Sequence, residues 1–231
     1  MSESVVEVDR VSKVYAQGSV KVCALRGVSV TIQKGDFAVL AGPSGSGKTT
    51  LLNLIGALDE PSEGRIALDG VDLSRMRSGA LASLRLHRIG FVFQAYNLIP
   101  VLTAYENAEY PLLLQGAPAA RRRERVQRVL DAVGLRGLEG RRPTELSGGQ
   151  QQRVAVARAI AAGPSLVLAD EPTANLDSRT GAELVDLMHG LNREHQVTFI
   201  FSSHDPKVVE RAERLIRLED GQLVSDERRA R

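Results

Sequence analysis

The chain has 231 residues, of which 43% are hydrophobic and 25% charged, with a formal net charge of +2. This is ordinary globular composition for one two-lobed domain or two small domains, and it implies no strong affinity for polyanions such as nucleic acids. The single cysteine, Cys23, excludes an internal disulfide and is expected to be a small buried residue. No signal core opens the chain, and no apolar run approaches the roughly 18 residues that span a bilayer. We therefore expect a cytoplasmic chain whose membrane role, if any, comes through a partner.

The N-terminal part of the chain is typical of short strands. β-Branched stretches at 5–8, 20–25 and 28–32 predict three of them. After a turn at Lys34-Gly35-Asp36, the apolar run 37–41 predicts a buried strand, and the residues from 51 to 55 begin a helix.

Between that strand and that helix lies a glycine-rich loop. Its residues are Gly42, Pro43, Ser44, Gly45, Ser46, Gly47, Lys48, Thr49 and Thr50, which match the pattern Gly, four residues, Gly-Lys-Ser/Thr. Glycines let the backbone close around a phosphate, so that N–H groups and a helix N-terminus point at one anion. Lys48 adds a positive charge, and the Thr49 hydroxyl is suited to bind Mg²⁺. The alternative, a Gly/Ser-rich linker, is disfavoured by the flanking strand and helix.

The middle of the chain changes character. A hairpin is predicted around 65–70, a helix at 78–86, and a strand at 89–93 that ends at Gln94. Residues 96–161 read mostly as helix, and 121–133 is amphipathic, with Val126, Val129, Leu130 and Val133 on one face. The basic run 121–125 is interpreted as either a nucleic-acid patch or a solvated helix face, and the second is favoured.

Strands and helices alternate again in the C-terminal part. Strands are predicted at 166–169 and 197–201, helices at 179–191 and 206–213, then a hairpin from 214 to 224 and a frayed tail at 226–231. This alternation around a helical insert predicts an α/β fold, with a mostly parallel sheet that carries the phosphate loop and a second, helical lobe.

An acidic pair follows the strand at 166–169. Because ligands gather at the carboxyl ends of parallel strands, Asp170 and Glu171 should face the phosphate loop. Asp170 is a candidate to hold Mg²⁺ through water beside Thr49, and Glu171 to orient or deprotonate the attacking water.

A third motif identifies the family. Leu146, Ser147, Gly148, Gly149 and Gln150 open a helix for which Ser147 is a plausible N-cap. Together with the other motifs, this string resembles the signature of ATP-binding cassette (ABC) ATPases. The resemblance implies a P-loop NTPase (RecA-like) core with an antiparallel β subdomain at 1–94 and 162–231, and an inserted α-helical subdomain at 95–161 that carries the signature.

The resemblance also implies roles for single residues. Tyr15 matches the aromatic that stacks on adenine, and Gln94 the glutamine that senses magnesium. Asp177 lies in the loop that bridges two ATPase subunits, and His204 matches the switch histidine that contacts the terminal phosphate. Alone, such a histidine would more often be structural. The other histidines have no such context.

The family geometry implies a partner. In ABC ATPases the signature of one subunit closes on the phosphate loop of another, so we expect a head-to-tail homodimer enclosing two ATP molecules with Mg²⁺. Ser147 and Gly149 would then act in trans, and an isolated chain would hydrolyse ATP poorly.

Two uses of this ATPase stay open. It is either the ATPase subunit of a membrane transporter, which the absence of coiled-coil insertions and of a second cassette favours, or the driver of a non-transport envelope process such as cell division. The segments 90–100, 142–147 and 168–177 are similar to the lipoprotein-release (LolD) and macrolide-export (MacB) subgroup, although Ser203 stands where that subgroup has threonine.

The segment from Gln94 to about Pro111 is expected to dock the permease, and its apolar residues serve either that contact or internal packing.

Overall fold

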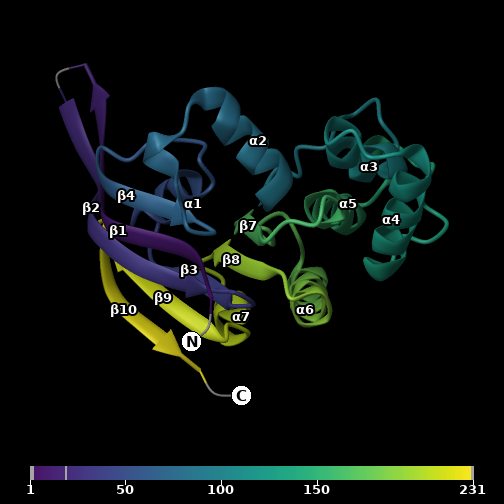
Figure 1. Ribbon diagram of the computed structural model, residues 1–231. Coiled ribbons are helices and arrows are strands. Elements are labelled where there is room, and N and C mark those ends of the chain that lie inside the picture. The colour runs from purple at the N-terminus through teal and green to yellow at the C-terminus, as the bar shows by residue number, and fades with distance from the viewer. Residues whose placement is uncertain (1–2, 19, 230–231) are drawn as a thin grey trace.

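Two β-sheets organise the chain in the computed structural model, which describes residues 3–18 and 20–229 (Figure 1). The six-stranded sheet has the order β10 (Gln222–Arg228), β9 (Arg214–Glu219), β3 (Phe37–Ala41), β8 (Thr198–Ser202), β7 (Leu166–Asp170), β6 (Ile89–Phe93). All its neighbouring strands are parallel except β10, which pairs antiparallel with β9. The four-stranded antiparallel sheet has the order β2 (Val20–Gln33), β1 (Ser4–Gln17), β4 (Glu63–Leu68), β5 (Val71–Asp72).

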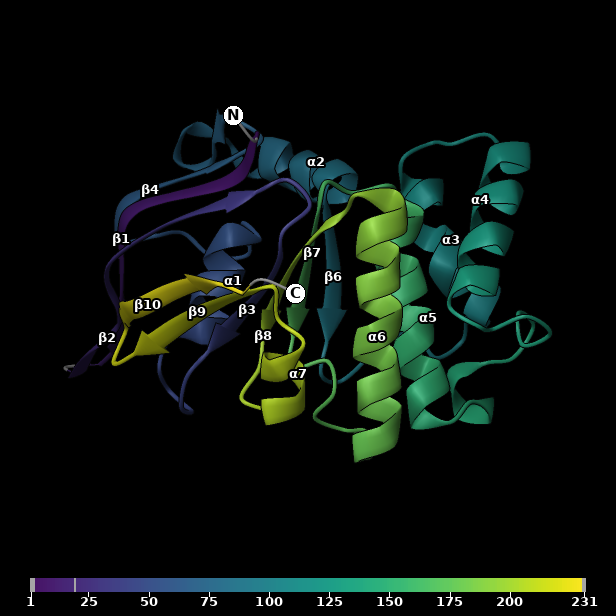
Figure 2. The ribbon, with the colours of Figure 1, turned by 90° about the horizontal axis from the view of Figure 1, so that it is seen from below.

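Helices lie on both sides of the six-stranded sheet (Figure 2). They are α1 (Lys48–Ile55), α2 (Ser78–Arg88), α3 (Ala104–Leu114), α4 (Ala119–Ala132), α5 (Gly148–Ala161), α6 (Ser178–His195) and α7 (Pro206–Glu210), with short 3₁₀ turns at Leu73–Arg75 and Pro143–Glu145. The predicted α/β fold, a mostly parallel sheet with an antiparallel sheet and a group of helices, is confirmed.

The central strands are buried on both faces. In β3, Phe37 and Val39 belong to a core shared with the helices α3 to α7, while Ala38 and Leu40 belong to a second core with α1 and the four-stranded sheet. Successive side chains of a strand point to opposite faces, so a strand between two cores must be apolar throughout. This is why the strands beside the phosphate loop are continuous apolar runs in the sequence.

The helix α4 confirms the predicted amphipathic pattern. Val126, Val129, Leu130 and Val133 are all buried in the core that α3 to α7 share with the sheet. Figure 2 shows α4 beside α3, at the end of the molecule away from β10. No helix of the described residues is long and apolar enough to cross a membrane.

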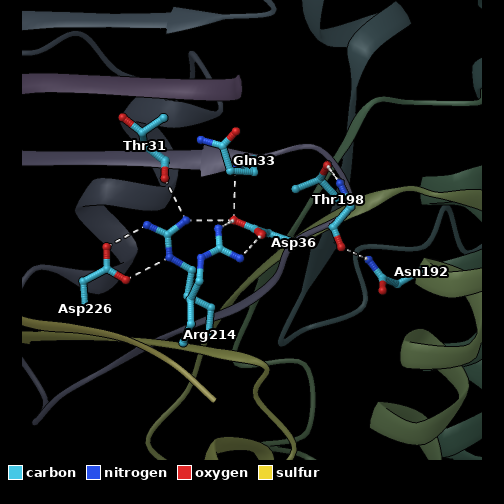
Figure 3. A network of polar contacts seen from close by, with 9 residues as sticks. Thr31, Gln33, Asp36, Asn192, Thr198, Arg214 and Asp226 are labelled. Atoms are coloured by element: carbon cyan, nitrogen blue, oxygen red, sulfur yellow. Dashed lines mark hydrogen bonds and ion pairs between the residues drawn. The ribbon is translucent and has the colours of Figure 1, made fainter. Parts of the chain in front are cut away.

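The C-terminal hairpin corrects the predicted frayed tail, because β10 continues to Arg228. Arg214 on β9 donates to Asp226 from both Nε (2.8 Å) and Nη2 (2.6 Å), and its Nη1 donates to Asp36 (2.8 Å) (Figure 3). The hydrogen bond to Asp226 is the main reason why the pKa of Arg214 is raised, against the effect of burial. Arg228 also pairs with Asp36 (3.0 Å). Asp226 and Arg228, which the sequence predicts to fray, are therefore ion-paired. The last two positions of that prediction lie outside the described residues.

Two further predictions near the N-terminus are corrected. The strands β1 and β2 are longer than the short β-branched stretches suggest, because they pair with each other along almost their whole length. Cys23 is exposed rather than buried. It lies on β2, the edge strand of the four-stranded sheet, near the end of the β1–β2 hairpin, where Lys21 and Val22 are exposed as well.

Candidate functional site

The glycine-rich loop between β3 and α1 is shaped by close backbone contacts. A Cβ added to Gly42 (φ 153°) would lie 2.1 Å from the carbonyl oxygen of Leu218, and one added to Gly47 (φ 102°) would lie 2.7 Å from that of Ala24. Side chains rarely adopt such φ values, and these contacts leave no room for one. Gly47 begins α1 without a side-chain cap, so backbone N–H groups of the first turn stay available to a ligand.

The loop's lysine is buried against the loop itself. Lys48 Nζ donates to the carbonyl oxygens of Gly42 (2.8 Å) and Pro43 (2.9 Å). This places a full positive charge beside the uncapped start of α1. The combination of helix N-terminus, close backbone and ammonium group fits a phosphate.

A cavity of about 500 Å³ opens over the loop. Most of the loop lines it, while Gly42 and Ser46 are not among its lining residues. Three predicted residues from other parts of the chain also line it: Gln94, Glu171 and His204. Ala24 and Ala174 line it too, and the sequence does not predict them because alanine carries no chemical signal. The volume suits a ligand of nucleotide size.

Topology explains this convergence. The loop follows β3, Gln94 follows β6, Asp170 ends β7 and His204 lies two residues after β8. These four strands are parallel neighbours, so their carboxyl ends meet at one edge of the sheet.

The acidic pair takes up two different positions, as its spacing predicts. Asp170 Oδ1 accepts a hydrogen bond from the Thr49 hydroxyl (3.1 Å), which places two of the three predicted magnesium-site residues together. The third, Gln94, lines the cavity. Glu171 has a positive φ of 46°, a strained conformation for this residue type, and its N–H donates to the carbonyl of Ser202 (3.0 Å). Its Oε1 lies 2.8 Å from Nδ1 of His204. Glu171 and His204 therefore form one hydrogen-bonded unit at the cavity.

The donor set fits a magnesium ion only in part. A hydroxyl and a carboxylate are the hard oxygen donors that Mg²⁺ prefers. Within the described ranges, no group of three or more His, Cys, Asp or Glu residues is arranged to hold a metal. Thr49 and Asp170 would thus need oxygens from water and a bound phosphate, which is how Mg²⁺ is usually held at phosphate sites.

Tyr15 lies outside this cavity's lining and is held by its neighbours. Its hydroxyl donates to Asp59 (2.8 Å), and Lys13 lies over its ring (4.9 Å to the centroid) while bonding to the same carboxylate (2.6 Å). Burial and the bond to Asp59 raise the pKa of Tyr15. Sequence reasoning missed Lys13 and Asp59, because 46 residues separate them.

The signature segment, Ser147 to Gln150, is not brought to the cavity. It forms a complete capping box at the start of α5: the Gln150 N–H donates to Ser147 Oγ (3.3 Å), and the Ser147 N–H to Gln150 Oε1 (2.8 Å). The predicted N-cap is confirmed. A Cβ on Gly148 would meet the Tyr96 hydroxyl and one on Gly149 the Thr180 methyl, so the segment lies beside the start of α6.

Asp177 is also absent from the cavity lining and caps the helix α6. It accepts hydrogen bonds from the N–H groups of Arg179 and Thr180 (3.0 Å each) and from the Thr180 hydroxyl (2.6 Å). The bonds from Thr180 lower its pKa. A bond from the Asn175 amide to the carbonyl of Gln94 (2.9 Å) joins this loop to the end of β6.

Comparisons with known proteins agree with this geometry. The family model described as ABC transporter matches residues 25–174, more than half of the chain. The lipoprotein-releasing system ATP-binding protein LolD 1 of Rhodopseudomonas palustris is 47% identical over 222 residues, covering 95% of this chain and 98% of that protein. The macrolide export ATP-binding/permease protein MacB of Brucella melitensis is 45% identical over 221 residues, but these are only 34% of its length.

A solved structure is similar over almost the whole chain. It is the dimeric, post-hydrolysis state, bound to ADP and Pi, of an ATP-binding cassette from Methanocaldococcus jannaschii. Its TM-score is 0.89 at 42% identity, with 98% of this chain and 100% of that chain covered. The family model, these relatives and the residues gathered at the cavity together show that the chain belongs to the ABC transporter family, as an ATP-binding protein that hydrolyses ATP.

Proposed function

We propose that the cavity over the phosphate loop is where ATP is hydrolysed, and that this hydrolysis drives a separate membrane permease. One observation carries the proposal. The Thr49–Asp170 and Glu171–His204 pairs, formed by residues far apart in sequence, lie beside the same loop. A merely structural acidic loop would need neither partner.

Each residue then has a distinct task. Lys48 and the N–H groups at the start of α1 bind the phosphates and offset their charge. Thr49 and Asp170 would hold Mg²⁺, with Gln94 nearby; the ion, when bound, would neutralise charge on the phosphate oxygens. The Glu171 carboxylate orients the attacking water and takes its proton, while His204 holds that carboxylate in position (2.8 Å).

The signature segment supports a second proposal, that two copies of the chain share each site. It lies outside the cavity in its own chain, yet it offers a helix N-terminus with small residues, a suitable surface for a second anion. The dimeric ADP- and Pi-bound relative supports a head-to-tail homodimer enclosing two nucleotides.

The Glu171→Gln variant tests both proposals. Glutamine keeps the size of the side chain but cannot take a proton, so turnover should fall by about 100-fold or more while ATP still binds. Light scattering with ATP should then show a stable dimer. The control Glu183→Gln removes an exposed carboxylate on α6 and should change neither result. A Glu171→Gln protein that stays monomeric with ATP and still hydrolyses it contradicts the site assignment.

The permease contact is proposed at a groove of about 310 Å³ next to the segment that follows Gln94. Its lining includes Phe91, Tyr110 and Leu114, and Leu114 is 56% exposed. Within the docking segment Leu98 packs inward against the core, while Val101 is 72% exposed. Internal packing thus explains Leu98, and the exposed apolar residues are better candidates for the permease.

Leu114→Asp tests this contact. A charge in an apolar interface should abolish co-purification of the permease, while ATP binding persists because Leu114 does not line the nucleotide cavity. Val224→Asp is the matched control, because Val224 is 50% exposed on β10 in the other half of the molecule. Equal permease recovery from both variants would contradict the docking proposal.

The proposal also includes the type of permease and the location of the protein in the cell. The similarity to LolD and MacB supports a permease of the lipoprotein-release or macrolide-export type and a location on the inner face of the cell membrane. We also propose that residues 95–161 form a helical subdomain that carries the signature segment. The gene neighbouring this one tests the subgroup: it should encode a permease with few membrane helices and a large extracytoplasmic insert.

A further inference from the structure

A second cavity, of about 570 Å³, lies where the ends of several helices meet. Its polar lining comes from the last turn of α2, the end of α3, and α4: His87, Gln115, Arg121, Glu124, Arg125 and Arg128. Ala161, the last residue of α5, lines it too, so it adjoins the end of α5 opposite to the signature segment. None of these residues lines the nucleotide cavity.

The cavity carries an excess of positive charge. Arg121, Arg125 and Arg128 stand four and three residues apart on α4, a spacing that places them on one face of the helix. The lining contains one carboxylate, Glu124, which pairs with Arg128 at 2.5 Å. Three arginines against one glutamate leave a formal charge of +2 in one concave space.

Structural roles account for only part of this cluster. Arg125 Nε and Nη2 donate to the carbonyl oxygens of Ala161 and Ile160 (3.2 Å each), which caps the end of α5. Burial, and then the charges of Arg128 and Arg121, lower the pKa of Arg125. Arg121 has no ion-pair partner within the part of the chain that the structure describes. Its charge is therefore not compensated by an ion pair and faces the cavity and solvent.

The rest of the basic run behaves differently. Arg122 does not line the cavity, and it pairs with Glu109 (2.8 Å) and with the carbonyl of Ala117 (2.7 Å). Arg123 is exposed, as Arg121 and Arg128 are, but unlike them it lies outside the cavity lining. Within the basic run 121–125, Arg122 therefore has structural partners, Arg123 faces solvent outside the cavity, and Arg121 and Arg125 line the cavity.

We propose that this cavity binds a phosphate-bearing anion, either the headgroup phosphate of an acidic phospholipid or a soluble phosphate compound. Arginine guanidinium groups bind phosphate oxygens through paired hydrogen bonds. The volume suits a small ligand or a headgroup, whereas a nucleic acid would need an extended basic surface.

The lipid source rests on the proposed permease contact. The cavity shares Ala162 with the docking groove, and its residues His87 and Leu112 directly follow the groove residues Leu86 and Pro111. A site beside a permease groove would lie near the membrane, where basic residues are drawn to acidic headgroups. The phosphate site itself rests only on the residues of the cavity.

Two assays on the full chain without permease test the proposal. In the first, sedimentation with vesicles of phosphatidylglycerol and phosphatidylcholine is compared with vesicles of phosphatidylcholine alone. In the second, inorganic phosphate is titrated into ADP-saturated protein while the backbone amide NMR signals of α4 are followed. Arg121→Gln should weaken binding at least threefold, and Arg121→Gln combined with Arg128→Gln more. Arg123→Gln, with the same charge change on the same helix, should not, and circular dichroism verifies the fold of each variant.

The outcomes separate the sources. Vesicle binding that falls only in the Arg121 variants supports a lipid headgroup, and phosphate-induced shifts without vesicle binding support a soluble phosphate compound. The proposal is overturned if the wild type does neither, if Arg123→Gln weakens binding as much as Arg121→Gln, or if the cluster binds single-stranded RNA in preference to both probes. Failure of the permease contact would leave these assays unchanged, because no permease is present in them.

Discussion

The phosphate loop and the signature segment both begin a helix with small residues, yet they differ in how that beginning is completed. The helix α1 starts at Gly47 with no side-chain cap, and the loop before it is held by backbone contacts with Ala24 and Leu218. The helix α5 starts with a full capping box formed within four residues. The first region depends on distant parts of the chain and keeps its N–H groups available. The second is capped by its own residues, and the N–H groups of Gly148 and Gly149 take no part in that box.

This difference bears on the proposal that two copies of the chain share each site. An uncapped helix start surrounded by Lys48, Asp170 and Glu171 is suited to receive an anion within its own chain. A capped start is locally stable and can be presented to another molecule without being reshaped. The helix α5 is joined to the ends of β6 and β7, because Gln152 is buried and donates to the carbonyls of Pro172 (2.7 Å) and Phe93 (3.3 Å).

The largest effect is expected from a methyl group placed in the phosphate loop. In Gly42→Ala the added Cβ would lie 2.1 Å from a backbone oxygen that cannot move alone, so the free energy of unfolding should fall by about 3 kcal/mol or more, and ATP binding should be lost. Gly148→Ala is the matched change in the signature segment. Its Cβ would meet only the end of the Tyr96 side chain (2.9 Å), which can rotate away. Urea denaturation and binding of a fluorescent ATP analogue check this, and equal losses would break the comparison.

A smaller effect is expected from the cap of α5. Ser147→Ala should cost about 1 kcal/mol of stability, leave ATP binding by the isolated chain intact and lower steady-state turnover by about 100-fold. Thr103→Ala is the control, because Thr103 and Glu106 form the same capping box at the start of α3. It should cost similar stability and leave turnover unchanged. If turnover falls equally in both variants, the signature segment acts only through helix stability.

The smallest effect is expected at Tyr15. Asp59→Asn weakens the carboxylate that holds both the Tyr15 hydroxyl and Lys13, so the aromatic ring should be less well oriented for a base. We expect KM for ATP to rise about three- to fivefold with kcat unchanged, since such pairs contribute up to about 1 kcal/mol. Glu124→Gln, which breaks an exposed ion pair on α4, should leave KM unchanged. A fall in kcat instead would show that Asp59 acts beyond base binding.

The sequence predicts best those functional residues that directly follow a strand of the parallel sheet. The loop and Glu171 are predicted from a motif and a strand end, and Gln94 and His204 from the resemblance to ABC ATPases. The structure brings most of the loop and these three residues to one cavity, because the strands before them are parallel neighbours. A continuous apolar run marks such a strand, since both of its faces are buried. These features are local, so the sequence displays them directly.

Contacts between distant polar residues could not be predicted in this way. Asp226 and Arg228 look like a solvated tail until Arg214 and Asp36 are known to lie beside them. The same holds for Lys13 and Asp59 around Tyr15, and for Arg121, whose surroundings come from α2, α3 and α5. Hydrophobic periodicity reports on burial, but it says nothing about which charged side chains meet across the fold.

The contact between the phosphate loop and the C-terminal hairpin has a consequence for biosynthesis. Leu218 covers Gly42, and the Gly221 N–H donates to the carbonyl of Ser46 (3.2 Å). Leu218 is made 176 residues after Gly42, and Gly221 is made 175 residues after Ser46, while a ribosome adds about 5 to 20 residues per second. For some seconds the nascent chain therefore displays a glycine-rich loop that has Ala24 beside it but lacks Leu218 and Gly221. The enzyme should gain its affinity for nucleotide late, when synthesis of the chain is almost complete.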